Sequence, residues 1–441
     1  MQSDRPAALG PRNITGAVRL TGLDTLRGLA AVAVVLLHAG IPYMRQPLSH
    51  LVWPVTDGCP CPLVDALAWW IEGFIMPLFF LLAGFFSAGL LAASGPQAFL
   101  SHRTKRILWP LLAACVVILP PCIYLWALGW VAEGVFVPRS ILMPGFPREL
   151  KAELYGTAHL WFLQYLYIYC LVLCGGSYLR RRFSAFDAAA QICSSRIGWR
   201  LKRLMLSAWK PLLPAIPCAL ILFWDPRIVV GFYQTFLPVA SKLLYYSIYY
   251  FTGVLVYRQH RCVRMQARYG KQFLTAAIAV FALALPLIHQ HRSAELTGAW
   301  RALMAALLAA FAWLTAFGLF GIFLAAKRGC NSATRYLADS SYWIYLIHLP
   351  FVALAHISIA RLPILTPAKF VLSATIAVGL SLMTYHAFVR YTWLGEALNG
   401  CRRKRGASVK PRLELAPAAV AAVRQFVAAE QGFAGDHRDV A

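Results

Sequence analysis

The chain has 441 residues, of which 60% are hydrophobic and only 13% are charged, and its formal net charge is +25. Average soluble proteins contain about 25% charged residues, so this composition and a mean hydropathy of +0.61 argue against a soluble enzyme and against a disordered nucleic-acid binder. The composition predicts an all-α polytopic membrane protein.

Ten apolar runs follow one another along the chain. A bilayer core of about 30 Å needs about 20 mostly apolar residues for each helical span. The runs that meet this requirement are 25–43, 66–92, 107–130, 158–176, 210–224, 239–257, 272–289, 299–326, 341–359 and 366–389. The fifth run is the weakest, because it is short and holds several prolines. We therefore expect a cytoplasmic segment over 1–24, a transmembrane domain over 25–390, and a cytoplasmic tail over 391–441 that is basic and then Ala-rich.

The Lys and Arg residues between these runs predict the orientation of the chain. With both termini in the cytoplasm, 32 of the 42 Lys and Arg residues lie on the inner side. Cytoplasmic loops carry such an excess, and removing one span would reverse every later loop. The charges therefore favour about ten spans with both termini inside. The first run carries Arg27 and His38, which favours a retained anchor over a cleaved signal peptide.

The first span places Arg27 and His38 on one helical face. Eleven residues turn about 20° past three full rotations and rise about 16 Å, so Arg27 lies at the inner boundary and His38 beyond mid-depth. Ionisable side chains are costly inside a bilayer, which makes both residues candidates for function. The alternatives are that Arg27 extends its charge to the interface and that His38 is a hydrogen-bonded packing residue.

Charged residues also flank the second and third spans. Glu72 lies near the outer boundary beside two tryptophans, where interfacial solvation is an alternative explanation. Arg103 and Arg106 precede the third span on the cytoplasmic side, where the positive-inside rule alone also explains them. The eleven cysteines show no zinc or haem spacing, so we expect no metal site.

The fourth and ninth spans carry further polar side chains. His159 lies at the outer mouth of the fourth span, followed by Trp161. In the ninth span Ser341, Tyr345 and His348 occupy positions i, i+4 and i+7, which form one polar stripe on an apolar helix. The alternative is that this stripe only joins neighbouring helices by hydrogen bonds.

Five motifs in the chain resemble a known family. They are the Arg and His eleven positions apart in the first span, MPLFFLLAGF, the basic RTKRILWP, HLWFL and SYWIYLIH. In this order and topology they are similar to the membrane-bound acyltransferase 3 family over residues 20–390, and most similar to the branch of osmoregulated periplasmic glucan succinyltransferases. That branch tends to have a basic residue before Met-Pro, where this chain has Ile75.

The resemblance implies a multi-pass O-acyltransferase of the bacterial inner membrane. The reaction that it implies moves an acyl group, such as succinyl or acetyl, from cytoplasmic acyl-CoA to a hydroxyl of a periplasmic or cell-surface glycan. The partners are then acyl-CoA, the glycan and the lipid bilayer. No tightly bound cofactor and no nucleic-acid partner are expected.

The resemblance implies the roles of Arg27 and His38, and the chemistry of the other polar residues suggests theirs. Arg27 and His38 would carry the family's essential pair, and we expect His348 to orient His38 or to stabilise the oxyanion. Guanidinium groups suit the phosphates of the donor, and the candidates are Arg27, Arg103, Arg106 and Arg335. The candidates for contacts with the acceptor are Glu72, His159, Trp161, Ser341 and Tyr345, with Trp161 available for stacking on a sugar. Neutral His38 would act as a general base in direct transfer or carry a covalent acyl group outward.

Two other functional classes fit ten spans with buried ionisable residues. A proton-coupled multi-span transporter would use these residues as a proton relay. A membrane scaffold would use them for packing alone. The sequence shows no inverted repeat and no matched pair of Gly- or Pro-interrupted helices, which favours the acyltransferase over the transporter.

Overall fold

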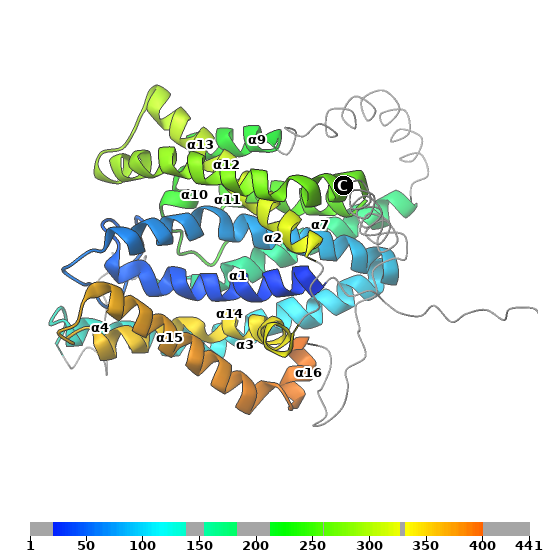
Figure 1. The fold of residues 1–441 in the computed structure, drawn as a ribbon. Coiled ribbons are helices and arrows are strands. Elements are labelled where there is room, and N and C mark those ends of the chain that lie inside the picture. Colours follow the sequence, from blue (N-terminus) through cyan, green and yellow to red (C-terminus); the bar gives the residue numbers. More distant parts are fainter. Residues whose placement is uncertain (1–20, 138–153, 183–211, 259, 327–330, 400–441) are drawn as a thin grey trace, which may run out of the picture.

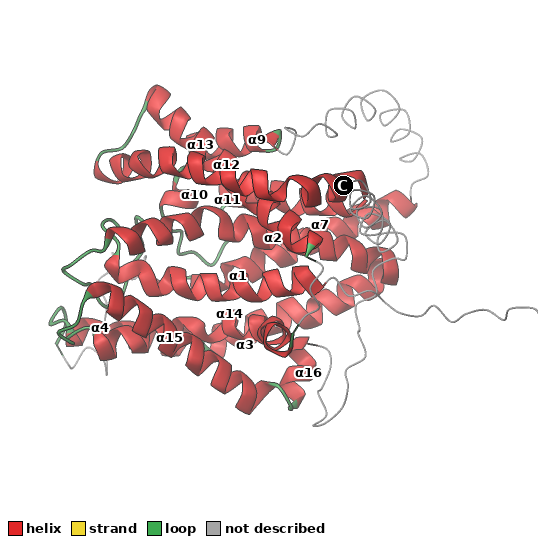
Figure 2. Ribbon diagram, viewed as in Figure 1, coloured by secondary structure: helices red, strands yellow, loops and turns green. Residues whose placement is uncertain are grey.

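The computed structural model describes residues 21–137, 154–182, 212–258, 260–326 and 331–399, which are almost entirely helical and contain no strand. The long helices run side by side in one bundle (Figures 1 and 2). They are α1 (Thr21–Gly40), α2 (Pro62–Arg103), α3 (Trp109–Val117), α4 (Leu119–Ala132), α7 (Trp161–Arg182), α9 (Ala215–Trp224), α11 (Ala240–Arg258), α12 (His260–Ser293), α13 (Gly298–Ala325), α14 (Ser332–Ile359) and α15 (Thr366–Thr384). The short elements are η1 (Ile41–Tyr43), η2 (Thr104–Leu108), η3 (Ala158–Leu160), α10 (Arg227–Val230), η5 (Tyr385–Val389) and α16 (Trp393–Asn399).

The polytopic architecture that the sequence predicts is confirmed. Each predicted run overlaps a helix in the described part of the chain, where seven helical segments are long and apolar enough to cross a membrane. One of these segments, Pro62–Ala132, contains two of the predicted runs. The run 210–224 yields only the ten-residue helix α9, and the run 239–257 yields the Tyr-rich helix α11, which is not among the seven. The count of ten is therefore not confirmed for these two runs, and residues 1–20 and 400–441 of the predicted terminal segments lie outside the described residues.

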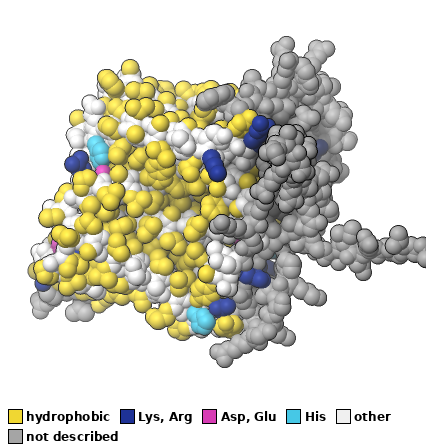
Figure 3. All heavy atoms as spheres, viewed as in Figure 1, with side chains coloured by type: hydrophobic (Ala, Val, Ile, Leu, Met, Phe, Trp, Pro, Cys, Tyr) yellow, Lys and Arg dark blue, Asp and Glu magenta, His cyan; other side chains and the backbone are white. Residues whose placement is uncertain are grey.

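The outer surface of the bundle fits a lipid environment. In the view of Figure 3, hydrophobic side chains cover the middle of the described surface, whereas the Lys and Arg side chains lie toward its two ends. Large apolar side chains such as Val116, Leu220 and Val371 are exposed on the helices. Exposed apolar side chains in this number are unfavourable in water and favourable against lipid tails.

Glycines allow the central helices to approach closely. Gly84 of α2 lies against the backbone carbonyl of Tyr250 in α11, and Gly253 of α11 lies against that of Leu81 in α2. A side chain at either glycine would collide with backbone, so this contact needs small residues, as is common between membrane helices. Gly28 has the same role between α1 and α14, because a β-carbon there would lie 3.0 Å from the amide nitrogen of Ala338.

Two loops meet at the end of the bundle where α1 ends and α2 begins. We call them the outer loops and define them as residues 44–61 and 225–239. The amide of Phe232 donates to the carbonyl oxygen of Ser49 at 2.8 Å, and the amide of Ser49 donates to that of Val230 at 3.4 Å. The indoles of Trp126 and Trp130 in α4 donate to the carbonyls of Val52 and Trp53, each at 2.9 Å. These bonds hold the outer loops against the helix ends.

Candidate active site

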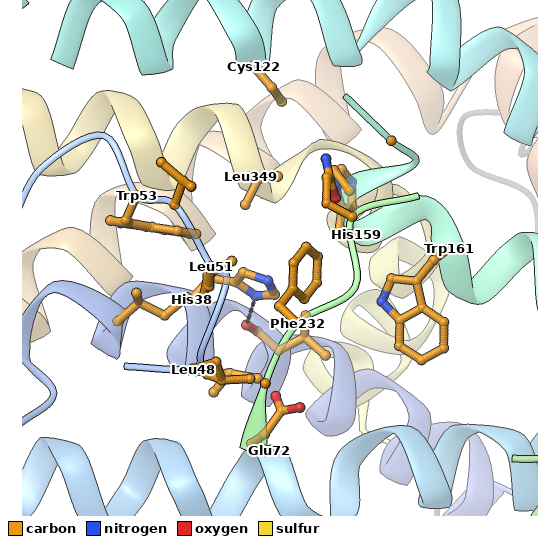
Figure 4. Close-up of a pocket in the computed structure, with 18 of the residues that line it drawn as sticks. His38, Leu48, Leu51, Trp53, Glu72, Cys122, His159, Trp161, Phe232 and Leu349 are labelled. Carbon is orange, nitrogen blue, oxygen red and sulfur yellow. Dashed lines mark hydrogen bonds between the residues drawn. The ribbon is translucent and has the colours of Figure 1, made fainter. Parts of the chain in front are cut away.

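A cavity of ≈ 110 Å³ lies beneath the outer loops and is lined by side chains of α1, α2, α4, α7, α11 and α14. Most of its lining is apolar. The ionisable side chains in the lining are His38, Glu72, Cys122, His159, Lys242, Tyr246 and Tyr345, and Figure 4 shows several of them around the central space. The cavity therefore joins the predicted base His38 to four of the five predicted acceptor residues, namely Glu72, His159, Trp161 and Tyr345.

His38 has a defined tautomer. Its Nδ1 lies 2.8 Å from the carbonyl oxygen of Val34 on the preceding turn, shown as the dashed line in Figure 4. A carbonyl oxygen can only accept, so Nδ1 carries the proton and donates it. The other ring nitrogen, Nε2, then holds the lone pair of the neutral ring. A half-buried imidazole with a free lone pair on the wall of a cavity is suited to take a proton.

Three imidazoles follow one another across the helices. The ring centre of His348 lies 4.9 Å from that of His38 and 5.1 Å from that of His159. His348 donates from Nδ1 to the carbonyl oxygens of Tyr345 at 2.8 Å and Ile344 at 3.1 Å. Its Nε2 is buried and has no hydrogen-bond partner among the described residues. His348 is thus the central ring of the three, although it does not itself line the cavity.

His159 and Tyr345 lock α14 to the start of α7. The Tyr345 hydroxyl donates to the backbone carbonyl of His159 at 2.6 Å, and His159 Nε2 donates to the backbone carbonyl of Leu346 at 3.0 Å. Ala158, the residue before His159, has φ of 45°, a left-handed conformation that is uncommon for residues other than glycine. Strained backbone of this kind clusters at functional sites.

Trp53 contacts the His38 ring, and His356 joins Trp53 to α1. The rings of His38 and Trp53 are stacked with their centres 6.0 Å apart. The indole of Trp53 donates to His356 Nδ1 at 3.1 Å, and His356 Nε2 donates to the carbonyl oxygen of Ala39 at 3.1 Å. Sequence reasoning missed both residues, because Trp53 comes from an outer loop and His356 lies beyond the predicted polar stripe.

Arg27 connects α1 to α14. Its Nε donates to the Ser341 hydroxyl at 3.3 Å, its Nη2 donates to the carbonyl of Ala338 at 3.1 Å, and the carboxylate of Asp24 lies 3.5 Å away. Because both Arg27 and His38 contact α14, the prediction that they share one face of the first span is confirmed. The structure places Ser341, a predicted acceptor residue, at this guanidinium and not among the residues that line the cavity.

The other predicted donor residues lie at the end of the bundle where α1 begins (Figure 1). Arg103 closes α2 and donates to the Ser87 hydroxyl at 3.1 Å. Arg106 lies in η2, where its backbone carbonyl accepts from the Tyr342 hydroxyl at 2.8 Å. Arg335 lies in the first turn of α14, and its buried Nε has no partner among the described residues. Each side chain is partly buried, and none of these arginines, nor Arg27, lines the cavity.

Lys242 is a cavity residue that sequence reasoning did not single out. Its ammonium lies 3.5 Å from the ring centre of Trp161, and only 4% of the residue is exposed. With both termini in the cytoplasm, Lys242 is one of the Lys and Arg residues that the sequence places on the outer side. The signal in the sequence is its place at the start of the Tyr-rich run that forms α11.

Asp225, at the start of the second outer loop, is already paired. The carboxylate of Asp225 accepts hydrogen bonds from the hydroxyls of Tyr233 at 2.6 Å and Ser241 at 2.5 Å. Burial and this carboxylate raise the pKa of Tyr233 in the outer loop, so its hydroxyl stays a donor. Within the described ranges, no group of three or more His, Cys, Asp or Glu side chains is arranged to hold a metal ion.

Comparison with known proteins gives one match. The model of the Acyl_transf_3 family, described as an acyltransferase domain, matches residues 20–386. No curated protein and no solved structure matches the chain.

Proposed function

The chain belongs to the Acyl_transf_3 family and is a membrane acyltransferase, and from this premise we propose an O-acyl transfer from cytoplasmic acyl-CoA to a hydroxyl of a periplasmic or cell-surface glycan. The family match favours an acyltransferase over the transporter and the scaffold. The observation that carries the proposal is the geometry of His38. Its Nδ1 donates a hydrogen bond to the carbonyl oxygen of Val34, which leaves Nε2 for proton transfer at the cavity wall.

The proposed chemistry uses the lone pair of His38. The acceptor hydroxyl gives its proton to Nε2 as its oxygen attacks the thioester carbonyl carbon. The tetrahedral intermediate then breaks its C–S bond, and the CoA thiolate takes the proton back from His38. The carbonyl of Val34 holds the ring orientation and stabilises the positive charge that the imidazole gains. In a two-step variant, Nε2 itself attacks the thioester carbonyl carbon, and the C–S bond breaks to release the CoA thiolate. The acceptor hydroxyl oxygen then attacks the acyl carbon, the C–N bond to His38 breaks, and the hydroxyl proton passes to the thiolate.

His348 fits a positioning role better than oxyanion stabilisation. Its Nδ1 proton is used on carbonyl oxygens of its own helix, so the neutral ring has no proton on Nε2 to offer to an oxyanion. Its ring instead packs edge-on against His38 at 4.9 Å. We infer that this contact fixes the plane of the His38 ring.

The donor would bind from the inner end. The adenine nucleotide part of acyl-CoA carries several phosphate charges, and arginine side chains bind phosphate through forked hydrogen bonds. The four arginines at this end supply such groups, namely Arg27, Arg103, Arg106 and Arg335. The eleven residues from Arg27 to His38 rise about 16 Å along α1, a path that the flexible pantetheine arm would follow.

The acceptor would bind in the outer part of the cavity. Glu72, His159, Trp161 and Tyr345 line this region under the outer loops. By resemblance to the glucan branch, the acyl group is succinyl or acetyl and the membrane is the bacterial inner membrane. Acyl-CoA enters as a substrate, and no tightly bound cofactor takes part.

Mass spectrometry of envelope glycans tests this function. Cells with and without the protein are compared, and isolated membranes are supplied with labelled acetyl-CoA or succinyl-CoA. We expect a glycan fraction that gains the mass of one acyl group only when the protein and its donor are both present. Transport of a solute with no release of CoA would contradict the proposal.

A further inference from the structure

Two side chains of opposite charge face the cavity with no hydrogen-bond partner in the described part of the chain. Glu72 comes from α2 and Lys242 from α11, and both line the cavity that holds His38. The two side chains act on each other electrostatically, and Asp225 also acts on Lys242. Neither Glu72 nor Lys242 forms a hydrogen bond or an ion pair within 4.0 Å with any described residue. The lysine is 96% buried, since its exposed fraction is 4%.

The lysine is fixed in place by aromatic rings. Its ammonium lies over Trp161 at 3.5 Å, with the ring centres of Phe232 at 5.8 Å and Tyr165 at 6.0 Å. A tryptophan face attracts a cation, but it accepts none of the ammonium's three N–H groups in the manner of an oxygen atom. The ammonium therefore still needs acceptors from another molecule.

The same reasoning applies to the carboxylate of Glu72, which is half-buried in the cavity lining. A carboxylate shielded from water needs donors, because such a charge without hydrogen bonds is unfavourable. An anionic ligand would pair with Lys242 but would be repelled by Glu72. A cationic ligand would pair with Glu72 but would be repelled by Lys242. A neutral ligand with neighbouring hydroxyls satisfies both, because a hydroxyl accepts from the ammonium and donates to the carboxylate.

We propose that Glu72 and Lys242 together form a diol subsite that holds two neighbouring hydroxyls of the acceptor while another hydroxyl is presented to His38. This inference rests on the proposed function and names the chemistry by which the acceptor is held. The pair acts as a specificity determinant, because it selects which hydroxyl reaches the base. Trp161 then serves to fix the ammonium, since one face of its ring is already covered by Lys242.

The test measures ligand binding to the purified full chain in detergent. The probes are a glucose oligosaccharide as the neutral polyol, succinate as the anion and ethanolamine as the cation, each titrated by isothermal calorimetry. The variants are Glu72→Gln, which keeps the shape of the side chain, and Lys242→Met, which keeps much of its length. Lys369→Met is the matched control, because Lys369 pairs with Asp57 at 2.9 Å and does not line the cavity.

We expect the wild-type chain to bind the oligosaccharide more tightly than either charged probe. Each cavity variant should weaken this binding about tenfold or more, the loss expected for a hydrogen bond to a charged group, whereas Lys369→Met should bind like the wild type. Lys242→Arg retains the charge, so it should bind the oligosaccharide better than Lys242→Met. This comparison, with gel filtration of each variant, separates loss of the charge from loss of the fold.

Three results would overturn the diol subsite. They are a wild-type chain that binds succinate or ethanolamine in preference to the oligosaccharide, a wild-type chain that binds none of the three probes, and cavity variants that bind the oligosaccharide as the wild type does. Failure of the proposed function has a different signature. In that case the wild-type chain fails to release CoA from acetyl-CoA and succinyl-CoA, whatever the binding data show.

Discussion

The ring centres of His38 and His348 lie 4.9 Å apart and nearly edge to face, although the two residues are 310 positions apart in the chain. Each ring uses Nδ1 to bind a carbonyl of its own helix. Both rings are therefore held in one orientation before any substrate arrives. Such preorganisation is what a base needs to accept a proton without first reorienting.

The first prediction concerns the contribution of the His348 ring. His348→Ala removes the ring that packs on His38, and we expect kcat to fall about tenfold while the KM for acyl-CoA changes little. His348→Phe restores an aromatic ring without its nitrogens and should recover most of kcat. A loss in His348→Phe as large as in His348→Ala would instead assign a chemical role to the imidazole nitrogens. Steady-state kinetics of CoA release measures both variants.

The second prediction concerns donor binding by Arg27. Arg27→Ala removes a guanidinium that also joins α1 to Ser341 and Ala338, and we expect the KM for acyl-CoA to rise about tenfold or more, the loss of one charge-assisted contact. Arg301→Ala is the matched control, because Arg301 donates to the carbonyl of Trp224 far from this end of α1. An unchanged KM with a lower kcat would show that Arg27 acts through the helix contact and not on the donor.

The third prediction concerns the close contact between α1 and α14. Gly28→Ala would place a β-carbon 3.0 Å from the amide nitrogen of Ala338, so the helices must move apart. Overpacking of this kind costs about 1–3 kcal/mol, and we expect a lower midpoint of thermal unfolding together with lower activity. Gly175→Ala is the control, since nothing lies within 4 Å of its β-carbon position. An equal midpoint for Gly28→Ala and the wild type would contradict this packing.

The fourth prediction concerns orientation in the membrane. Cys59 is an exposed free cysteine in an outer loop. With Arg27 at the cytoplasmic side, a membrane-impermeant maleimide applied to the periplasmic face should label Cys59 in intact spheroplasts. Labelling should disappear in a Cys59→Ser, Cys61→Ser variant. Labelling of Cys59 only after the membrane is opened would reverse the predicted topology.

Some of this architecture follows from the sequence because it depends on local periodicity. The shared face of Arg27 and His38 follows from the 3.6-residue turn, and so does the stripe of Ser341, Tyr345 and His348. The structure shows that this stripe faces Arg27, His159 and His38. Periodicity indicates which side chains share a face of a helix, but it gives no information about which helix lies opposite.

The rest of the site depends on packing between distant segments. Trp53 reaches His38 only because an outer loop folds back over the helix ends, and no local pattern predicts that return. The sequence does not single out Lys242, because its burial depends on Trp161 on another helix. Ser341 shares the stripe with Tyr345. It nevertheless accepts a hydrogen bond from Arg27, because α1 approaches α14 closely at Gly28. Long-range contacts of this kind decide which polar residues enter a cavity.

The rate of acyl transfer by a His38→Ala variant tests the central claim most directly. Purified wild type, His38→Ala and the control His386→Ala, which alters an exposed histidine in η5, are compared for CoA release from acetyl-CoA and succinyl-CoA and for acylation of the glycan. Loss of a general base predicts a rate about 10²-fold to 10⁴-fold lower for His38→Ala, with His386→Ala close to the wild type. A His38→Ala protein that folds normally and transfers acyl groups at the wild-type rate would contradict the assignment of His38 as the base.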